Sequence, residues 1–364
     1  MKLSSLPYIV KKEILDHLSI NDIFFLSLCS KNTKNFIIQT QKYQFKKVEN
    51  VTYFINGEIM FINITMNTDS MPTNFMCLFR TPEDFLKATT EGDQESDAVE
   101  EIQVNELKTS VNFFRSPIIQ NDLHPKYCSD NAESIIEAIH DHLYELLGHH
   151  TKFWLKGTPK GKTHFLPKLR NIQLLDIWGG GLNLTRIDEF LSRSTCLEYF
   201  SLNASRRDTL EFERDSKIYE LDTLYAGPVR SVATGVMKYF NGRHAFLDCH
   251  SMKASNVIQF LNEWKSGEKF RYLEVIALES YFNIPKVRRS VEFKELDTAV
   301  VYSFTRKFQK SNRLYPCQFE SRSYMVRQSD GCVASVLLSM SLSFVGVWNM
   351  TESEFLEKFQ RSRG

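Results

Sequence analysis

The sequence predicts an α/β protein in which a small three-helix segment precedes a larger domain built around a mixed sheet. Three observations carry this prediction. Residues 6–38 place apolar residues at helical spacing. Residues 170–278 alternate between short apolar runs and amphipathic stretches, which is the pattern of strands joined by helices. Residues 324–347 contain short apolar runs separated by a turn, which is typical of antiparallel strands.

Three short helices are predicted near the N-terminus. Pro7 can open the first, because the N–H that proline lacks would have no partner in the first turn, and apolar residues then recur four apart from Val10. Asn21 or Asp22 can cap a second helix, and a third begins near Asn32. Helices this short bury too little apolar surface to be stable alone. The segment is therefore expected to be covered by another surface.

The apolar positions of this segment follow a fixed order. The segment contains, in turn, Leu6, Pro7, Ile14, Leu15, Leu18, Leu26 and Leu28, followed directly by Cys29, Ser30 and Lys31. This order resembles the F-box, whose motif runs leucine–proline, isoleucine–leucine, leucine, and then an apolar residue, cysteine or serine, and a base. Tyr8 stands where an acid is common in the family, and Thr33 where many members carry tryptophan. The resemblance covers residues 1–45.

The resemblance implies an adaptor protein without catalytic residues. An F-box docks on the small Skp-type adaptor of an SCF (cullin–RING) ubiquitin ligase and, through that adaptor, on the cullin. The ten residues of the ordered series that runs from Leu6 to Lys31 would supply the contact, although some of them must pack between the three helices instead. Residues 46–364 would then hold a target protein, of unknown identity, close to the ligase.

Length, charge and cysteine content bound the function classes. A chain of 364 residues accommodates a small module and one large domain. Its 45 Lys and Arg balance 44 Asp and Glu, which argues against nucleic-acid binding by bulk charge. The seven cysteines lack metal-type spacing, and the most apolar run, residues 333–348, is too short to span a membrane. We expect a cytoplasmic or nuclear protein with no metal or cofactor.

Residues 46–155 contain three recognisable patterns. Alternating apolar residues flank the turn Asn56-Gly57 and predict a hairpin. Residues 89–106 hold seven acids and no base, which predicts a mobile loop. Asp130 or Asn131 can cap a helix that ends at Gly148 and precedes a short strand.

Residues 170–278 contain two similar strand–helix–strand patterns. The first comprises a strand at 170–177, a helix at 187–191 and a strand at 197–202, and the second repeats the order at 245–249, 257–264 and 273–278. Such units stack as irregular α/β solenoids, in the manner of leucine-rich repeats, because one unit alone cannot cover its apolar face.

A second resemblance concerns the C-terminal part. Residues 243–278, with Phe246-Leu247-Asp248 and the run from Phe260 to Trp264, are similar to the F-box-associated domain (type 2) that follows the F-box in many nematode proteins. Residues 330–348 are similar to the end of that domain. A helix at 351–359 is predicted to close the chain.

Several local motifs do not reach the standard of a catalytic or ligand site. Residues 157–163 are one residue short of a phosphate-binding loop, so a basic surface turn is favoured. Residues 179–181 lack the context of a dinucleotide site. His140 and His142 lie two apart on a predicted helix and face different directions, and His149-His150 is read as surface. A repeat-type interaction module without a ligase link remains the main alternative, and an enzyme with a site in the repeats a further one.

Overall fold

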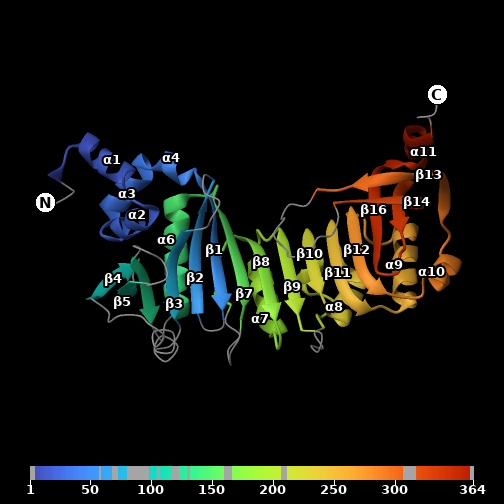
Figure 1. Ribbon diagram of the computed structural model, residues 1–364, viewed down its shortest axis with the longest axis horizontal. Coiled ribbons are helices and arrows are strands. Elements are labelled where there is room, and N and C mark those ends of the chain that lie inside the picture. Colours follow the sequence, from blue (N-terminus) through green and yellow to red (C-terminus); the bar gives the residue numbers. More distant parts are fainter. Residues whose placement is uncertain are drawn as a thin grey trace. The chain divides into compact units, whose positions relative to one another are not determined.

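The computed structural model describes residues 5–56, 59–67, 73–79, 98–104, 107–115, 123–128, 132–159, 166–205, 211–305 and 317–360. The chain folds into two compact units. Unit 1 comprises Met1–Leu175 with Arg193–Cys196, and unit 2 comprises Asp176–Ser192 with Leu197–Gly364. Within the described residues the fold is mixed α/β, with helices at the N-terminus and extensive mixed β-sheet (Figure 1).

Four helices open unit 1: α1 (Tyr8–Asp16), α2 (Ile20–Leu28), α3 (Lys31–Thr40) and the single turn α4 (Lys42–Phe45). Pro7 is the N-cap of α1, so it lies one residue before the first helical position that the sequence predicts for it. The predicted caps of α2, Asn21 or Asp22, are wrong, because Ser19 is the N-cap and its hydroxyl accepts from the Asp22 N–H. The Asp22 carboxylate in turn accepts from the Ser19 N–H and completes a capping box.

The third helix starts slightly earlier than the sequence predicts. Its N-cap is Ser30, whose hydroxyl accepts a hydrogen bond from the Thr33 N–H at 3.1 Å. Ser19 and Ser30 thus end the turns before α2 and α3. Replacing Ser19 with alanine should lower the free energy of unfolding of unit 1 by about 1 kcal/mol, whereas Ser19→Asn should retain it, as measured by urea unfolding.

The sheet of unit 1 contains, in spatial order, β7 (Lys152–Thr158), β1 (Val48–Asn56), β2 (Ile59–Met66), β3 (Thr73–Phe79), β6 (Leu123–Cys128), β5 (Leu107–Arg115) and β4 (Ala98–Val104). The β1–β2 hairpin is confirmed by its antiparallel register, with Asn56 opposite Ile59, although Gly57 lies outside the described residues. The β1–β7 pair is parallel.

The expected acidic loop at 89–106 is wrong for residues 98–104, which form β4. This strand pairs antiparallel with β5, from Ala98 opposite Phe113 to Val104 opposite Leu107. The acidic residues disfavour a strand, but Val99, Ile102 and Val104 between them are β-branched residues that favour one. The rest of the expected loop lies outside the described residues.

Helix α6 (Ala132–Leu147) lies against the sheet of unit 1 and ends at Gly148, as predicted (Figure 1). Its His140 packs edge-on against Phe153 of β7 and bonds through Nδ1 to the hydroxyl of Tyr53 on β1 at 2.9 Å. One long helix therefore covers the junction of β1 and β7.

Gly157 belongs to β7, and the packing of β7 against β1 accounts for a glycine at this position without a bound phosphate. Its φ of +133° lies in a region that side chains rarely adopt, and a Cβ placed there would be 1.9 Å from the backbone oxygen of Ile55 on β1. The glycine therefore allows two parallel strands to approach. Residues 160–163 of the former phosphate-loop candidate lie outside the described residues.

Within its described residues, unit 2 contains four parallel strands, with one α-helix before them, two α-helices between them and one α-helix after them. The strands are β9 (Tyr199–Ala204), β10 (Thr223–Gly227), β11 (His244–Ser251) and β12 (Val275–Tyr281), and the helices are α7 (Leu184–Arg193), α8 (Arg230–Tyr239), α9 (Ala254–Ser266) and α10 (Ile284–Ser290). The predicted α7, β9, β11, α9 and β12 are confirmed, as is β8 (Ile172–Gly179), within which the two units divide. The sequence did not predict β10, α8 or α10.

An antiparallel half completes unit 2. β16 (Leu342–Thr351) pairs with β12 and is followed across the sheet by β15 (Cys332–Leu337), β14 (Gln318–Val326) and β13 (Lys294–Ser303). Helix α11 (Glu352–Gln360) packs against this half through Phe355, which is fully buried and belongs to one cluster with the buried Leu296, Tyr324 and Val333. The predicted antiparallel strands and closing helix are confirmed; β13 was not predicted.

The parallel strands of unit 2 are buried along both faces. All five residues of β10 are buried, as are the first six of β11 and the first four of β12. Tyr199 on β9 is buried, whereas Trp178 on β8 is half-buried. Exposed side chains of these strands and of their connections therefore gather at the strand ends.

Candidate functional site

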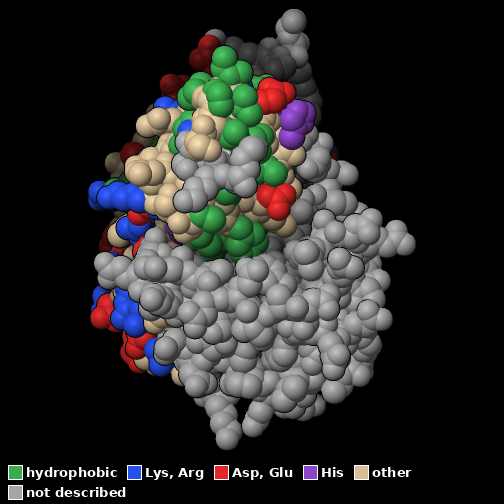
Figure 2. Space-filling view, turned by 90° about the vertical axis from the view of Figure 1, so that its left-hand side faces the viewer, with side chains coloured by type: hydrophobic (Ala, Val, Ile, Leu, Met, Phe, Trp, Pro, Cys, Tyr) green, Lys and Arg blue, Asp and Glu red, His purple; other side chains and the backbone are tan. Residues whose placement is uncertain are grey.

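The first turn of α1 presents apolar side chains to solvent. Tyr8 is 61% exposed, Ile9 77% and Val10 43%, and Pro7 before them is exposed as well. Figure 2 shows hydrophobic side chains grouped on the end of unit 1 where the N-terminal helices lie. Three consecutive exposed apolar residues on one helical turn are a feature of interaction surfaces. We call Pro7, Tyr8, Ile9 and Val10 the α1 surface.

The ten residues singled out in the sequence divide into three groups. Leu15 is fully buried and belongs to the interior. The exposed members are Pro7, Cys29, Ser30 and Lys31, and the partly buried members are Leu6, Ile14, Leu18, Leu26 and Leu28.

Polar and aromatic contacts fix α1 on α3 and α4. The rings of Tyr8 and Phe36 meet edge to face with centroids 5.7 Å apart. Gln41 donates to the Asp16 carboxylate at 2.9 Å, and Lys12 donates to the same carboxylate at 2.8 Å. These two hydrogen bonds, that of Lys12 first, lower the pKa of Asp16. Helix α1, which carries the α1 surface, is thus fixed in place by contacts with Phe36 and Gln41.

The opposite side of the N-terminal helices packs on α6. Phe24 is 1% exposed and meets the ring of His142 edge to face at 5.5 Å. The hydroxyl of Ser27, 2% exposed, lies 2.7 Å from Nε2 of His142. Lys34 on α3 also forms an ion pair with Glu145 on α6. Helix α6 therefore covers α2 and α3 and leaves the α1 surface exposed.

The Ser27–His142 hydrogen bond favours one protonation state of the imidazole. The Ser27 hydroxyl lies 2.6 Å from the backbone oxygen of Phe24 and donates to it, so Nε2–H of His142 donates to Ser27. Nδ1 is then an unprotonated nitrogen, and it is buried without a hydrogen-bond partner among the described residues. Burial, and secondarily Lys34, lower the pKa of His142 to about 4.

His140 is the second buried imidazole of α6, and it faces the sheet. Its Nε2 lies 2.8 Å from the backbone oxygen of Arg170, and its Nδ1 bonds to Tyr53. Burial lowers its pKa to about 4. His140 and His142 thus face different neighbours, as their spacing predicts, while the predicted surface residues His149 and His150 are exposed.

Comparison with protein families settles the nature of the N-terminal helices. The family model of the F-box domain matches residues 3–44. Residues 3–44 are an F-box domain. No curated protein and no solved structure matches the chain. F-box domains are in general adaptors that bind Skp-type proteins within SCF ubiquitin ligases, rather than catalytic domains.

The matched residues 3–44 include both the α1 surface and the side of α2 that packs on α6. The F-box has one side packed against α6 of its own chain and another side, the α1 surface, exposed to solvent. Sequence reasoning did not select Tyr8, Ile9 or Val10 as contact residues. The apolar character of all three was visible in the sequence, but the direction in which each faces depends on how α1 packs on α3.

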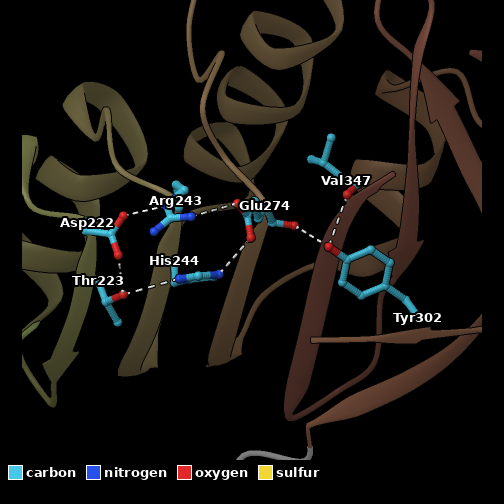
Figure 3. Close-up of polar contacts among 7 residues, drawn as sticks. All are labelled: Asp222, Thr223, Arg243, His244, Glu274, Tyr302 and Val347. Atoms are coloured by element: carbon cyan, nitrogen blue, oxygen red, sulfur yellow. Dashed lines mark hydrogen bonds and ion pairs between the residues drawn. The ribbon is translucent and has the colours of Figure 1, made fainter. Parts of the chain in front are cut away.

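Unit 2 contains a second polar cluster at the amino-terminal ends of β10, β11 and β12 (Figure 3). Arg243 donates to Asp222 at 2.5 Å and to Glu274 at 3.4 Å. His244 bonds through Nδ1 to the Thr223 hydroxyl at 3.2 Å and through Nε2 to Glu274 at 3.1 Å.

This cluster ties neighbouring strands together. Its members occupy equivalent positions at the start of adjacent strands, and the Tyr302 hydroxyl lies 2.9 Å and 3.1 Å from the backbone oxygens of Glu274 and Val347 (Figure 3). Thr223 is 5% exposed, and the order hydroxyl, imidazole, carboxylate superficially resembles a catalytic triad. Because these side chains hydrogen-bond along the row of strand starts, we assign the cluster a structural role.

Neither a metal-type cluster nor a membrane-spanning helix is present in the part of the chain that the structure describes. The described residues contain no group of three or more His, Cys, Asp or Glu side chains able to hold a metal ion. They also contain no helix that is long and apolar enough to cross a membrane. The F-box match at residues 3–44 is the finding that bears directly on function.

Proposed function

We propose that the chain is a substrate-recognition adaptor of an SCF ubiquitin ligase, with its F-box bound to the Skp-type adaptor and thereby to the cullin. Residues 46–364 would bind a target protein for ubiquitin-dependent degradation, in the cytoplasm or nucleus. The proposal is supported by the F-box match at residues 3–44 together with the exposed α1 surface.

The α1 surface is the proposed centre of the adaptor contact. Helix α6 covers the Phe24 and Ser27 side of the F-box, so a partner has access to the other side. Pro7 and the partly buried Leu6 border the exposed Ile9. The predicted contact residues Ile14, Leu18, Leu26, Leu28, Cys29, Ser30 and Lys31 would extend the contact, whereas Leu15 would support it from the interior.

The larger part of the chain is proposed to be an F-box-associated domain of the nematode type with an irregular, leucine-rich-repeat-like character. The parallel strands β9 to β12, with helices after β10 and β11, support the repeat interpretation. The burial of both faces of these strands distinguishes them from an open solenoid with one exposed sheet face.

Binding of the Skp-type adaptor by the full chain tests the proposal. We expect saturable binding in biolayer interferometry, weakened at least about 30-fold by Ile9→Asp, because a charge would be buried at the centre of an apolar contact. Replacing Leu6 and Pro7 together with alanine should weaken binding by about tenfold.

A matched control places the same charge elsewhere. Val301 on β13 is 50% exposed and apolar, so Val301→Asp should leave adaptor binding within about twofold. If the parent chain fails to bind the adaptor, the ligase role is excluded and a repeat-type interaction module without a ubiquitin link becomes the better account.

A further inference from the structure

We propose that the carboxyl-terminal edge of β10, β11 and β12 binds an acidic segment of the target protein that also carries apolar side chains. This inference rests on the proposed function, since it names the chemistry of the target. The edge lies where the chain leaves each of these strands to enter α8, α9 and α10. We call the residues involved the carboxyl-edge surface: Arg230, His250, Lys253, Tyr281, Lys286 and Met340.

Each of the three connections carries one exposed cation. Arg230 is the first residue of α8, Lys253 precedes α9, and Lys286 lies in the first turn of α10. Since β10, β11 and β12 are parallel neighbours, about 4.8 Å apart, the three cations follow one another along a single edge.

These cations lack the acidic partners that other bases of unit 2 have. Among the described residues none of the three forms an ion pair, whereas Arg243, Lys265 and others do. The acids near the ends of these strands are Asp248 of β11, which is 6% exposed, and Glu279 of β12, which is exposed, so one exposed carboxylate faces three exposed cations. The exposed charge of the edge is therefore positive.

Their positions also oppose the stability of the helices. A base at the start of a helix meets the positive end of the helix dipole and is unfavourable, whereas an acid there is favourable. The first turns of α8, α9 and α10 contain no acid. The arrangement therefore stabilises no helix of this chain, but it would favour an anionic partner.

Large apolar side chains lie beside the cations. Tyr281, at the end of β12, is 56% exposed, and Met340, in the turn between β15 and β16, is 76% exposed. The Ser280 N–H donates to the backbone oxygen of Ser341 at 3.0 Å, which joins this turn to the end of β12. Exposed aromatic and methionine side chains are characteristic of protein contacts.

Contacts within unit 2 connect Arg230, His250 and Tyr281. Arg230 donates to the hydroxyl of Ser251, which pairs in register with Tyr281. The rings of His250 and Tyr281 lie 6.0 Å apart. A surface that combines unpaired cations with exposed apolar side chains matches a peptide in which acids alternate with apolar residues.

Fluorescence anisotropy of the full chain with a labelled probe tests this inference. The probe is a fluorescein-labelled peptide in which pairs of glutamates alternate with single leucines, and a second peptide carries glutamine in place of glutamate. We expect saturable binding of the first peptide below about 1 mM and at least about tenfold weaker binding of the second.

Variants locate the binding surface. The triple variant Arg230→Glu, Lys253→Glu, Lys286→Glu should weaken binding of the acidic peptide at least about tenfold. The matched triple Arg193→Glu, Arg271→Glu, Arg322→Glu changes exposed arginines elsewhere and should stay within about twofold. Tyr281→Ser with Met340→Ser should weaken binding by about fivefold.

Four results would overturn the inference: no saturation by the acidic peptide, equal binding of the glutamine peptide, an equal loss in both triple variants, or tighter binding of a single-stranded RNA oligonucleotide. Adaptor binding by the same proteins is measured in parallel. A chain that binds the adaptor but not the acidic peptide refutes this inference alone, whereas the reverse result refutes the ligase role alone.

Discussion

Replacing Gly157 with alanine is expected to lower the free energy of unfolding of unit 1 by more than about 3 kcal/mol. The added Cβ would lie 1.9 Å from the backbone oxygen of Ile55, a distance at which β1 and β7 must separate. The residue would also have to hold a φ of +133°. Urea unfolding followed by circular dichroism measures the loss.

Gly148 provides the matched control. Its φ is +84°, but the nearest atom to an added Cβ is Nδ1 of His150 at 3.4 Å, at the end of an exposed side chain. Gly148→Ala should therefore cost only about 1 kcal/mol from backbone strain. If both variants lost the same stability, the close approach of β1 and β7 would not be the reason for Gly157.

Acidification from pH 7 to pH 5 is expected to destabilise unit 1 through His140 and His142. Both imidazoles have a pKa of about 4 in the folded chain, against the ordinary histidine pKa of 6.5. Below pH 6.5 the unfolded chain takes up protons that the folded chain excludes, so stability falls with pH until about pH 4. Each histidine should contribute about 2 kcal/mol of this loss by pH 5.

The comparison of variants isolates this effect from the titration of carboxylates. His140→Gln with His142→Gln removes both titrating groups, so its loss of stability between pH 7 and pH 5 should be about 4 kcal/mol smaller than that of the parent. Denaturant unfolding at both pH values gives the two differences. Equal losses in the parent and the variant would show that these imidazoles take up protons in the folded chain.

Strong local patterns account for the elements that the sequence predicted. Helix α9 carries its apolar residues at helical spacing and ends at Gly267 with φ of +81°, and β11 and β12 are continuous apolar runs. The leucine–proline pair at the start of the F-box and the leucine–cysteine–serine–lysine run at its end are sufficient to indicate the domain from sequence.

The elements that the sequence did not predict have weaker local sequence patterns. Helix α8 has a glycine, Gly235, in its interior, which disfavours a helix in isolation. The structure requires it, because a Cβ there would lie 2.3 Å from the Tyr219 hydroxyl. Strand β10 is a run of five buried residues without alternation, and β13 pairs with β14 through an irregular register. Tertiary packing, rather than local preference, determines these three elements.

The sequence also could not predict which apolar residues of the F-box are buried and which are exposed. Leu15 and Ile9 are both apolar residues of α1, yet Leu15 is fully buried and Ile9 is 77% exposed. The side of α2 that carries Phe24 and Ser27 is buried by α6, which follows more than a hundred residues later. Local spacing gives the faces of a helix but not the identity of a distant neighbour.

The contact between α2 and α6 has a practical consequence for work with fragments. A peptide that stops at residue 45 would keep the F-box sequence but lose His142 and Glu145, and it would turn Phe24 and Ser27 outward. Such a fragment would expose two apolar surfaces, the α1 surface and the side of α2 that carries Phe24, and it should self-associate or bind unrelated proteins. Binding measurements on the isolated module would then include non-specific partners, so the full-length protein is the appropriate reagent.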